Sequence, residues 1–577
     1  MINVGLSAYA GGGLLTLDMV HHNPGEPQTR SAYLRPDFLK SKGYDAKVFF
    51  LFDAAQFGID WKGFDPEIFE EKSDERKWVD ARAATIDSLY NSAKEEGLGV
   101  YCMLDMLVLP RKMVEKYSTR LLNEEGKIDI SRSFTQKCVR HLIRSMFSRF
   151  PQLDGLIIRT GETYLQDAPY HVGNHPVVAG MDDHVTLLSI LREEVCARLD
   201  KDLIYRTWDM GKLHSLPKYY LGLADKIAPH KHLYFSIKHT ITDFWRMGMA
   251  QEVPDLDIYW INESGKYGVP FNPCLGIGCH KQIVEVQCQR EYEGKGAHPN
   301  YIAHGVIDGF AELNDTQAIN SLSRLNDRSD LLSGVWTWSR GGGWGGPYIT
   351  NEFWIDLNAS VVTLWANDPS KSEEECFCEV VRKMGLPEEQ IPLLRRLCLL
   401  TEDGVLKGQY SQYGSSYVNW TRDDSMTGDN AMQGYIDDII RSGRAAQYAA
   451  EKDEATAIWS EIADLSKQIA FPDADLNEFI RVSCDYGRLK YGILAAGWKL
   501  MLLKRDTELS GTIHDRSEIT RMLDEYDRMW NAWRKLSEDH TVCPTLYSAD
   551  IDFYGNQIGL NRTADSLREI INTIANK

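Results

Sequence analysis

This sequence has few cysteines for a disulfide-rich protein, no long apolar run and fewer basic than acidic residues, and each of these features excludes a class of protein. The 577 residues include 11 cysteines, which is far too few for a disulfide scaffold. The closest cysteines lack the paired C-x2-C spacing of a zinc site, so we expect neither a bound metal nor another cofactor. No run of ~18 apolar residues occurs, so we expect no transmembrane helix and no membrane partner.

The charge balance is acidic. Lysine and arginine total 64 against 83 aspartates and glutamates, so the formal net charge is −19. A nucleic-acid-binding protein needs a basic face for the phosphates, so we expect no nucleic-acid partner. The N-terminal sequence MINVGLSAYAGGG has no basic segment followed by an apolar one, so no signal peptide is visible. The cytoplasm is therefore the expected location. The same N-terminal sequence would remain if a signal peptide had been removed.

Short apolar runs alternate with amphipathic stretches over the first 365 residues or so. Alternating strand and helix signals indicate βα units around a parallel sheet, and about eight such units predict an α/β fold, a (β/α)8 TIM barrel. The alternative is an open doubly wound sheet, but no G-x-G-x-x-G motif follows the first run. The apolar runs are 4–9, 46–52, 99–106, 154–160, 202–208, 232–239, 257–262, 282–287 and 333–339.

Helical periodicity dominates from residue 366 to the end. Long helical patterns without intervening strands are typical of a packed all-α domain. We therefore predict a catalytic barrel over 1–365 and a helical C-terminal domain over 366–577. This second domain is suited to support, to covering the barrel mouth or to forming a homodimer contact.

Three carboxylates follow predicted strands: Glu162, Asp243 and Glu291. In a (β/α)8 barrel the catalytic groups lie at the C-terminal ends of the strands, so these side chains are expected to face one mouth. Hydrolysis of a glycosidic bond needs one protonated carboxyl to donate to the leaving oxygen and one carboxylate to activate water or attack carbon. The alternative for each residue alone is a loop anchor or an ion-pair partner.

Three basic residues lie on the same predicted strands: Arg159, Arg206 and Lys238. A buried cation without a partner is costly, so each could simply pair with a catalytic carboxylate. The functional alternative is a cationic pocket for an anionic substrate, because an arginine fork matches the two oxygens of a carboxylate.

Aromatic residues suggest how a sugar ring is held. The stretch WTWSRGGGWGGPYITNEFW, residues 336–354, mixes tryptophan with glycine, and Trp344 between glycines is the best candidate for stacking. The alternative is a packed loop that closes the barrel. Tyr164, Trp208 and His239 are further candidates for contact with the substrate.

Four segments of the sequence resemble the glycoside hydrolase family 67 α-glucuronidases. They are DGLIIRTGETY, IYRTW, SIKHTITDFW and EVQCQREYEG, which occur in the family's order within residues 80–310. The resemblance implies an inverting hydrolase that removes glucuronic or 4-O-methylglucuronic acid from xylan side chains. Glu162 matches the general acid, Asp243 and Glu291 match the pair that holds and activates water, and Arg206 and Lys238 match contacts to the uronate.

The sequence also departs from that family. Arg159 matches a family lysine only with a shift of one residue, and the segment between Asp243 and Glu291 is longer and carries a rival carboxylate, Glu263. Which carboxylate is the base, and whether Glu263 or Glu285 takes part, stay open. The two other hypotheses are a barrel glycosidase on a neutral or differently linked sugar and a non-catalytic sugar-binding relative.

Overall fold

The structure of the protein is a computed structural model. It describes residues 13–20, 31–161, 168–208, 212–240, 271–290, 293–313, 319–340, 351–411, 436–511, 514–540, 542 and 559–575.

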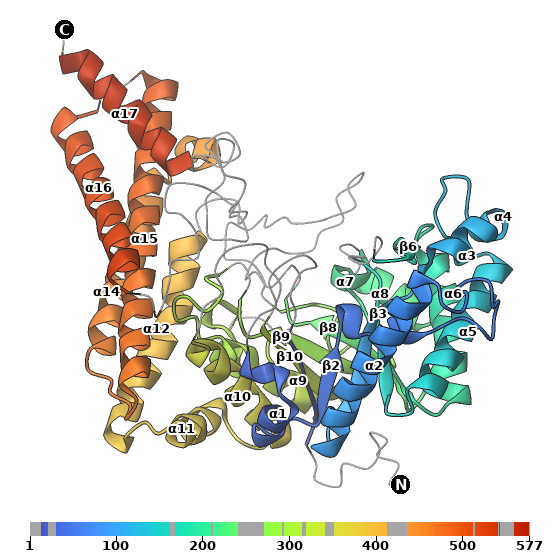
Figure 1. The fold of residues 1–577 in the computed structure, drawn as a ribbon. Helices are drawn as coiled ribbons and strands as arrows, with labels where there is room; N and C mark the ends of the chain where they lie inside the picture. Colours follow the sequence, from blue (N-terminus) through green and yellow to red (C-terminus); the bar gives the residue numbers. More distant parts are fainter. Residues whose placement is uncertain are drawn as a thin grey trace.

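Eight parallel strands form a closed barrel, as the alternating sequence pattern predicts (Figure 1). Their order around the barrel is β1-β10-β9-β8-β7-β5-β3-β2, so the first strand pairs with the last and leaves no open edge. An antiparallel pair, β4 (Val108–Pro110) and β6 (His171–Gly173), lies outside the barrel. The barrel strands are β1 (Leu15–Val20), β2 (Ala46–Phe49), β3 (Gly99–Asp105), β5 (Gly155–Arg159), β7 (Asp202–Arg206), β8 (Leu233–Lys238), β9 (Lys281–Gln287) and β10 (Leu332–Arg340).

The first barrel strand is not one of the predicted apolar runs. It is Leu15–Val20, whereas the runs at 4–9 and 257–262 lie outside the described residues. Its sequence LTLDMV interrupts the apolar pattern with Asp18, whose carboxylate accepts hydrogen bonds from Thr337 and Ser339. A polar residue with partners on the neighbouring strand is compatible with a buried strand.

Helices connect the strands and cover the barrel. The 22-residue α2 begins where the side chain of Ser73 accepts the backbone N–H of Arg76, which satisfies one of the open donors of the first turn. The helices of this part are α1 (Pro36–Ser41), α2 (Asp74–Glu95), α3 (Arg111–Lys116), α4 (Ser118–Leu121), α5 (Ser133–Arg149), α6 (Met181–Leu191), α7 (Lys212–Ser215), α8 (Pro217–Ala224), α9 (Leu322–Arg328) and α10 (Phe353–Asn367).

Large side chains fill the end of the barrel at which the strands begin, called the lower end below. Tyr101 points inward on β3 and its hydroxyl donates to Asp202 on β7 at 2.8 Å. A Cβ atom built on Gly155 would lie 2.7 Å from the Tyr101 ring, so the tyrosine occupies space that only a glycine leaves. This end is therefore a packed core, and it is the opposite, C-terminal end of the strands that carries the charged residues described below.

The described residues after α10 form helices and their connections, and no strand follows β10 among them. Helices α12, α14, α15 and α16 lie side by side against one flank of the barrel (Figure 1). The indole Nε1 of Trp354 on α10 donates to Ser483 Oγ on α15 at 2.9 Å, which joins the two parts. None of the described helices is long and apolar enough to cross a membrane. The helices are α11 (Glu373–Lys383), α12 (Ile391–Gln409), α14 (Ala445–Ser466), α15 (Ala474–Ser510), α16 (Arg516–Asp539) and α17 (Gly559–Ala575).

Candidate active site at the barrel mouth

Five buried charged side chains gather at the C-terminal ends of β3, β5, β7, β8 and β9. None is more than 2% exposed. The strand register sets Asp105 beside Arg159 and Lys238 beside Glu285, so opposite charges are neighbours across the sheet. Strand residues alternate between the two faces of a barrel, and the contacts below show that these five point inward. They are Asp105, Arg159, Arg206, Lys238 and Glu285.

Arg206 on β7 and Glu285 on β9 form a buried ion pair over the intervening strand β8. Arg206 Nε lies 2.9 and 3.0 Å from the two Glu285 carboxylate oxygens, and Nη2 lies 2.9 Å from Oε2. Ser236 Oγ donates to Glu285 Oε1 at 2.6 Å. The guanidinium also lies over Trp338, 4.8 Å from the ring centroid. A two-point charge-assisted contact of this kind fixes the arginine in one orientation.

The side chains of Lys238 and Trp208 lie next to each other. Both residues were predicted from the sequence to contact the substrate. The ammonium of Lys238 is 3.5 Å from the centroid of the Trp208 ring and 6.0 Å from that of Trp338. Both side chains are buried, with Lys238 1% and Trp208 5% exposed. An ammonium held on an aromatic face beside a second tryptophan makes a small cationic and aromatic surface at the mouth.

Arg159 lies on β5, between β3 and β7 in the barrel, and β7 separates it from the strand of Lys238. Its Nε is 3.9 Å from Asp105 Oδ1, and its guanidinium is 5.3 Å from the centroid of Phe50. Arg159, Arg206 and Lys238 therefore come from β5, β7 and β8, which are consecutive around the barrel. The structure brings the three predicted cations to the same end of three adjacent strands, as their positions at strand ends predict.

His239 is placed differently from Lys238. Its Nδ1 lies 3.2 Å from the backbone oxygen of Glu285, and its ring is 6.2 Å from that of Phe271. The side chain is fully buried, and burial lowers its pKa to about 3, so the imidazole is neutral. The structure does not group His239 with Lys238 and Trp208.

Several mouth residues were not selected from the sequence. Gln287 on β9 and Trp338 on β10 are register partners and share the inward face with Glu285. Arg340, two residues beyond Trp338, donates from Nε to Glu352 Oε1 at 2.8 Å. The signal that could have found them is the alternation itself, because every second residue of a recognised barrel strand points inward.

The predicted carboxylates and two of the predicted aromatic residues lie outside the described residues. The strands that precede the carboxylates are β5, β8 and β9, and all three end at the mouth. That these residues share one site stays a prediction. These residues are Glu162, Asp243, Glu291, Tyr164 and Trp344.

One group of possible metal ligands exists among the described residues. Ligand atoms of His304, Asp308 and Glu373 lie within 4.8 Å of one another. However, Glu373 accepts a hydrogen bond from Arg395 Nη1 at 2.7 Å and another from the hydroxyl of Tyr301. The arginine thus supplies the positive charge next to this carboxylate, and we interpret the group as an ion-pair network between α11 and α12.

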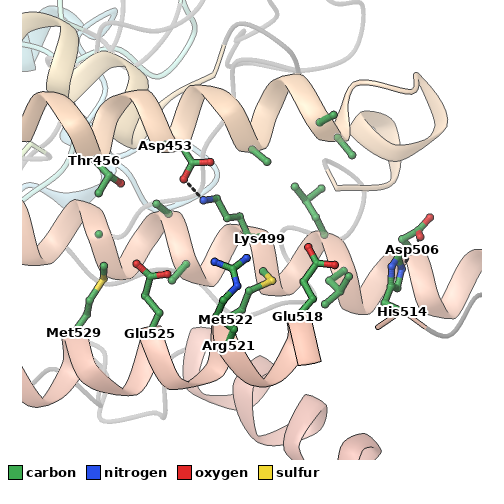
Figure 2. A pocket seen from close by; sticks show the side chains of 18 residues that line it. Asp453, Thr456, Lys499, Asp506, His514, Glu518, Arg521, Met522, Glu525 and Met529 are labelled. Carbon is green, nitrogen blue, oxygen red and sulfur yellow. Dashed lines mark hydrogen bonds and ion pairs between the residues drawn. The ribbon is translucent and has the colours of Figure 1, made fainter. Parts of the chain in front are cut away.

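A cavity of about 550 Å³ lies between α14, α15 and α16 in the helical domain (Figure 2). Small residues such as Ala449, Gly492 and Ala496 line it, and Lys499 forms an ion pair with Asp453 at its edge. Asp453 is 65% exposed, so its charge is largely solvated. The buried, convergent charges are at the barrel mouth, which is why we place the candidate active site there.

No protein-family model and no curated protein matches this sequence. Among solved structures, a GH138 enzyme targeting pectin rhamnogalacturonan II matches with a TM-score of 0.59 and 10% sequence identity. The match covers 98% of this chain and 84% of that one. The chain shares the fold of this glycoside hydrolase. The structural match includes both the barrel and the helical domain, whereas the sequence resemblance to family 67 covers only part of the barrel.

More distant structures also match. An O-GlcNAc hydrolase from Thermobaculum terrenum has a TM-score of 0.39 and 9% identity over 96% of this chain and 94% of that one. A chitobiase from Flavobacterium johnsoniae has a TM-score of 0.32 and 13% identity over 97% and 78%. At these values the likeness carries no argument. The barrel implied by the family 67 resemblance is confirmed, and membership of family 67 stays a prediction.

Proposed function

We propose that this protein is a glycoside hydrolase that removes an α-linked uronic acid from plant-type oligosaccharides such as xylan fragments. The proposed sugar is glucuronic or 4-O-methylglucuronic acid. The observation that carries the proposal is the gathering of Arg159, Arg206 and Lys238, all buried, at the mouth of a barrel that has a glycoside hydrolase fold.

The cations at the barrel mouth supply groups that can bind an anionic ligand. Arg159 lies near Asp105, and Arg206 is bound to Glu285. A guanidinium or an ammonium forms strong charge-assisted hydrogen bonds with a carboxylate, and a substrate carboxylate could take this role. Lys238 is the best candidate for this contact because its ammonium lies on Trp208, where a sugar ring and its carboxylate could be held together.

In the proposed mechanism Glu162 is the general acid, and Asp243 and Glu291 hold and activate the water. Inversion requires the acid and the base to be ~6.5–9.5 Å apart, whereas a retaining enzyme has ~5–5.5 Å between its two carboxyl groups. The roles follow from the family 67 resemblance and from the strand ends after which these residues occur.

A second candidate function is a barrel glycosidase that acts on a neutral sugar. The observation in its favour is the Arg206–Glu285 pair, since this arginine already has a carboxylate partner. The fold neighbour targets pectin, so pectin oligosaccharides belong in any test beside xylan fragments.

The test is NMR of the products released from glucuronoxylan and pectin oligosaccharides. We expect a free uronic acid whose first-formed anomer is β, which is the inverted product of an α-linkage. An initial α-anomer would refute inversion. Glu162→Gln serves as the matched control, because activity that persists in it comes from a contaminant or from another acid. No hydrolysis of any glycan in the panel would favour a non-catalytic sugar-binding protein.

Lys238→Met tests the carboxylate contact. The variant keeps an unbranched apolar side chain on Trp208 but removes the charge. We expect kcat/KM for a uronoside to fall roughly 10- to 100-fold, the value of one charge-assisted hydrogen bond, with a much smaller loss for the neutral hexoside. Equal losses for the two substrates would favour the neutral-sugar alternative.

A further inference from the structure

The chain that follows β9 leaves the barrel mouth and packs against the helical domain. Residues 293–305 are largely buried, and they contact α12 and α15, which are distant in sequence. The backbone N–H of Tyr301 donates to Thr401 Oγ1 at 2.9 Å, and that of Gly305 donates to Glu402 Oε1 at 3.0 Å. Side chains of α12 thus satisfy backbone donors of this segment.

Glu293 is the centre of the first anchor. Its Oε2 accepts from Arg290 Nε at 2.5 Å and from Asn300 Nδ2 at 3.1 Å. Its Oε1 accepts from the hydroxyl of Tyr410, which directly follows α12, at 2.7 Å. Arg290, Glu293 and Tyr410 are each 1% exposed. The carboxylate therefore bridges the end of β9 and the end of α12 in a site from which water is excluded.

His298 is the centre of the second anchor. Its ring stacks on Tyr486 at 6.1 Å between centroids and meets Trp459 edge to face at 5.2 Å. Lys490 Nζ lies 3.3 Å from His298 Nε2. Gly294 has a φ of +94°, and a Cβ there would lie 2.2 Å from that same nitrogen, so the turn before the anchor requires glycine.

Backbone conformation shows the same constraint at the first anchor. Arg290 has a φ of +61°, in the left-handed region that residues other than glycine, asparagine and aspartate rarely adopt. A residue persists in that region only where surrounding contacts hold it. The contacts here are those of Arg290 with Glu293, which in turn is held by Tyr410.

We propose that the helical domain is part of the active-site scaffold, with Glu293 and Tyr410 as positioning residues that fix the chain leaving β9. The inference rests on the proposed function for its catalytic consequence. In the sequence, the predicted water-activating Glu291 lies between Arg290 and Glu293. Loosening this anchor should therefore impair the chemical step more than the binding of the sugar.

The experiment compares the full-length wild type with Tyr410→Phe, which removes only the hydroxyl that donates to Glu293. The matched control is Tyr101→Phe, which loses a buried hydroxyl-to-carboxylate bond of 2.8 Å at the other end of the barrel. Both variants should lose a similar amount of stability. Only Tyr410→Phe should speed amide hydrogen exchange in peptides covering 293–305, by about 10-fold or more.

Turnover provides the second readout. With a uronoside that the wild type hydrolyses, Tyr410→Phe should lower kcat by roughly 10-fold while KM stays within about twofold, and Tyr101→Phe should leave both unchanged. Unchanged exchange in Tyr410→Phe would refute the anchor. Faster exchange with unchanged kcat would refute the positioning role. A wild type inactive on every uronoside would refute the proposed function, and the exchange result would then decide the anchor alone.

Discussion

Replacing Glu285 with glutamine tests the Arg206–Glu285 pair, the best-defined polar contact at the barrel mouth. Both side chains are buried, at 2% and 0% exposure. The glutamine keeps an oxygen that can accept the Ser236 hydroxyl, so that 2.6 Å bond can survive. What is lost is the negative charge beside a guanidinium that the barrel still encloses.

The expected cost follows from that geometry. Removing one partner of a buried pair leaves the other charge uncompensated, which typically costs ~3–5 kcal/mol. The cation–π contact of Arg206 with Trp338, 4.8 Å from the ring centroid, is present with either residue at 285, so it leaves this cost unchanged. We therefore expect Glu285→Gln to lower the free energy of unfolding by about 3 kcal/mol.

The assay is urea unfolding of the wild type, Glu285→Gln, Arg206→Met and the double variant. The double variant should be less destabilised than the sum of the single variants, because it removes both charges together. Asp37→Asn is the control, since Asp37 pairs with Arg35 at the surface and should leave the unfolding midpoint unchanged. Additive effects of the two single substitutions would refute the reasoning, because they would mean that the two charges do not stabilise each other.

Two further predictions concern the barrel wall and its lower end. Burial raises the pKa of Asp18 from 3.8 to about 6, so the fold favours its protonated form and stability falls as the pH rises from about 4 to about 6. Asp18→Asn should therefore be up to about 3 kcal/mol more stable than the wild type at pH 7 and equal to it near pH 4. Urea unfolding at both pH values measures this difference in the free energy of unfolding. A difference that does not change with pH would refute the prediction. Gly155→Ala should destabilise the barrel by about 1–3 kcal/mol, because its Cβ would lie 2.7 Å from Tyr101, whereas Gly222→Ala, 3.6 Å from Met181, should not. Equal unfolding midpoints for the two alanine variants would contradict the packing at that end.

Most strands of the barrel could be predicted from the sequence, whereas the side-chain contacts between them could not. Runs such as 154–160 and 282–287 became β5 and β9, because apolar residues of that spacing form strands buried on both faces. Strand order then placed Arg159, Arg206 and Lys238 at one end, because all parallel strands of a barrel end on the same side. The general location of the site could thus be predicted.

Which side chains contact one another depends on the tertiary structure. Arg206 is 79 residues from Glu285, and nothing local to either residue indicates that the two share a height inside the barrel. The anchor from Glu293 to Tyr410 spans 117 residues and depends on how α12 docks against the barrel. Periodicity is a local property that the chain carries in its sequence, whereas contacts between distant side chains depend on strand register and helix packing, which exist only once the core has formed.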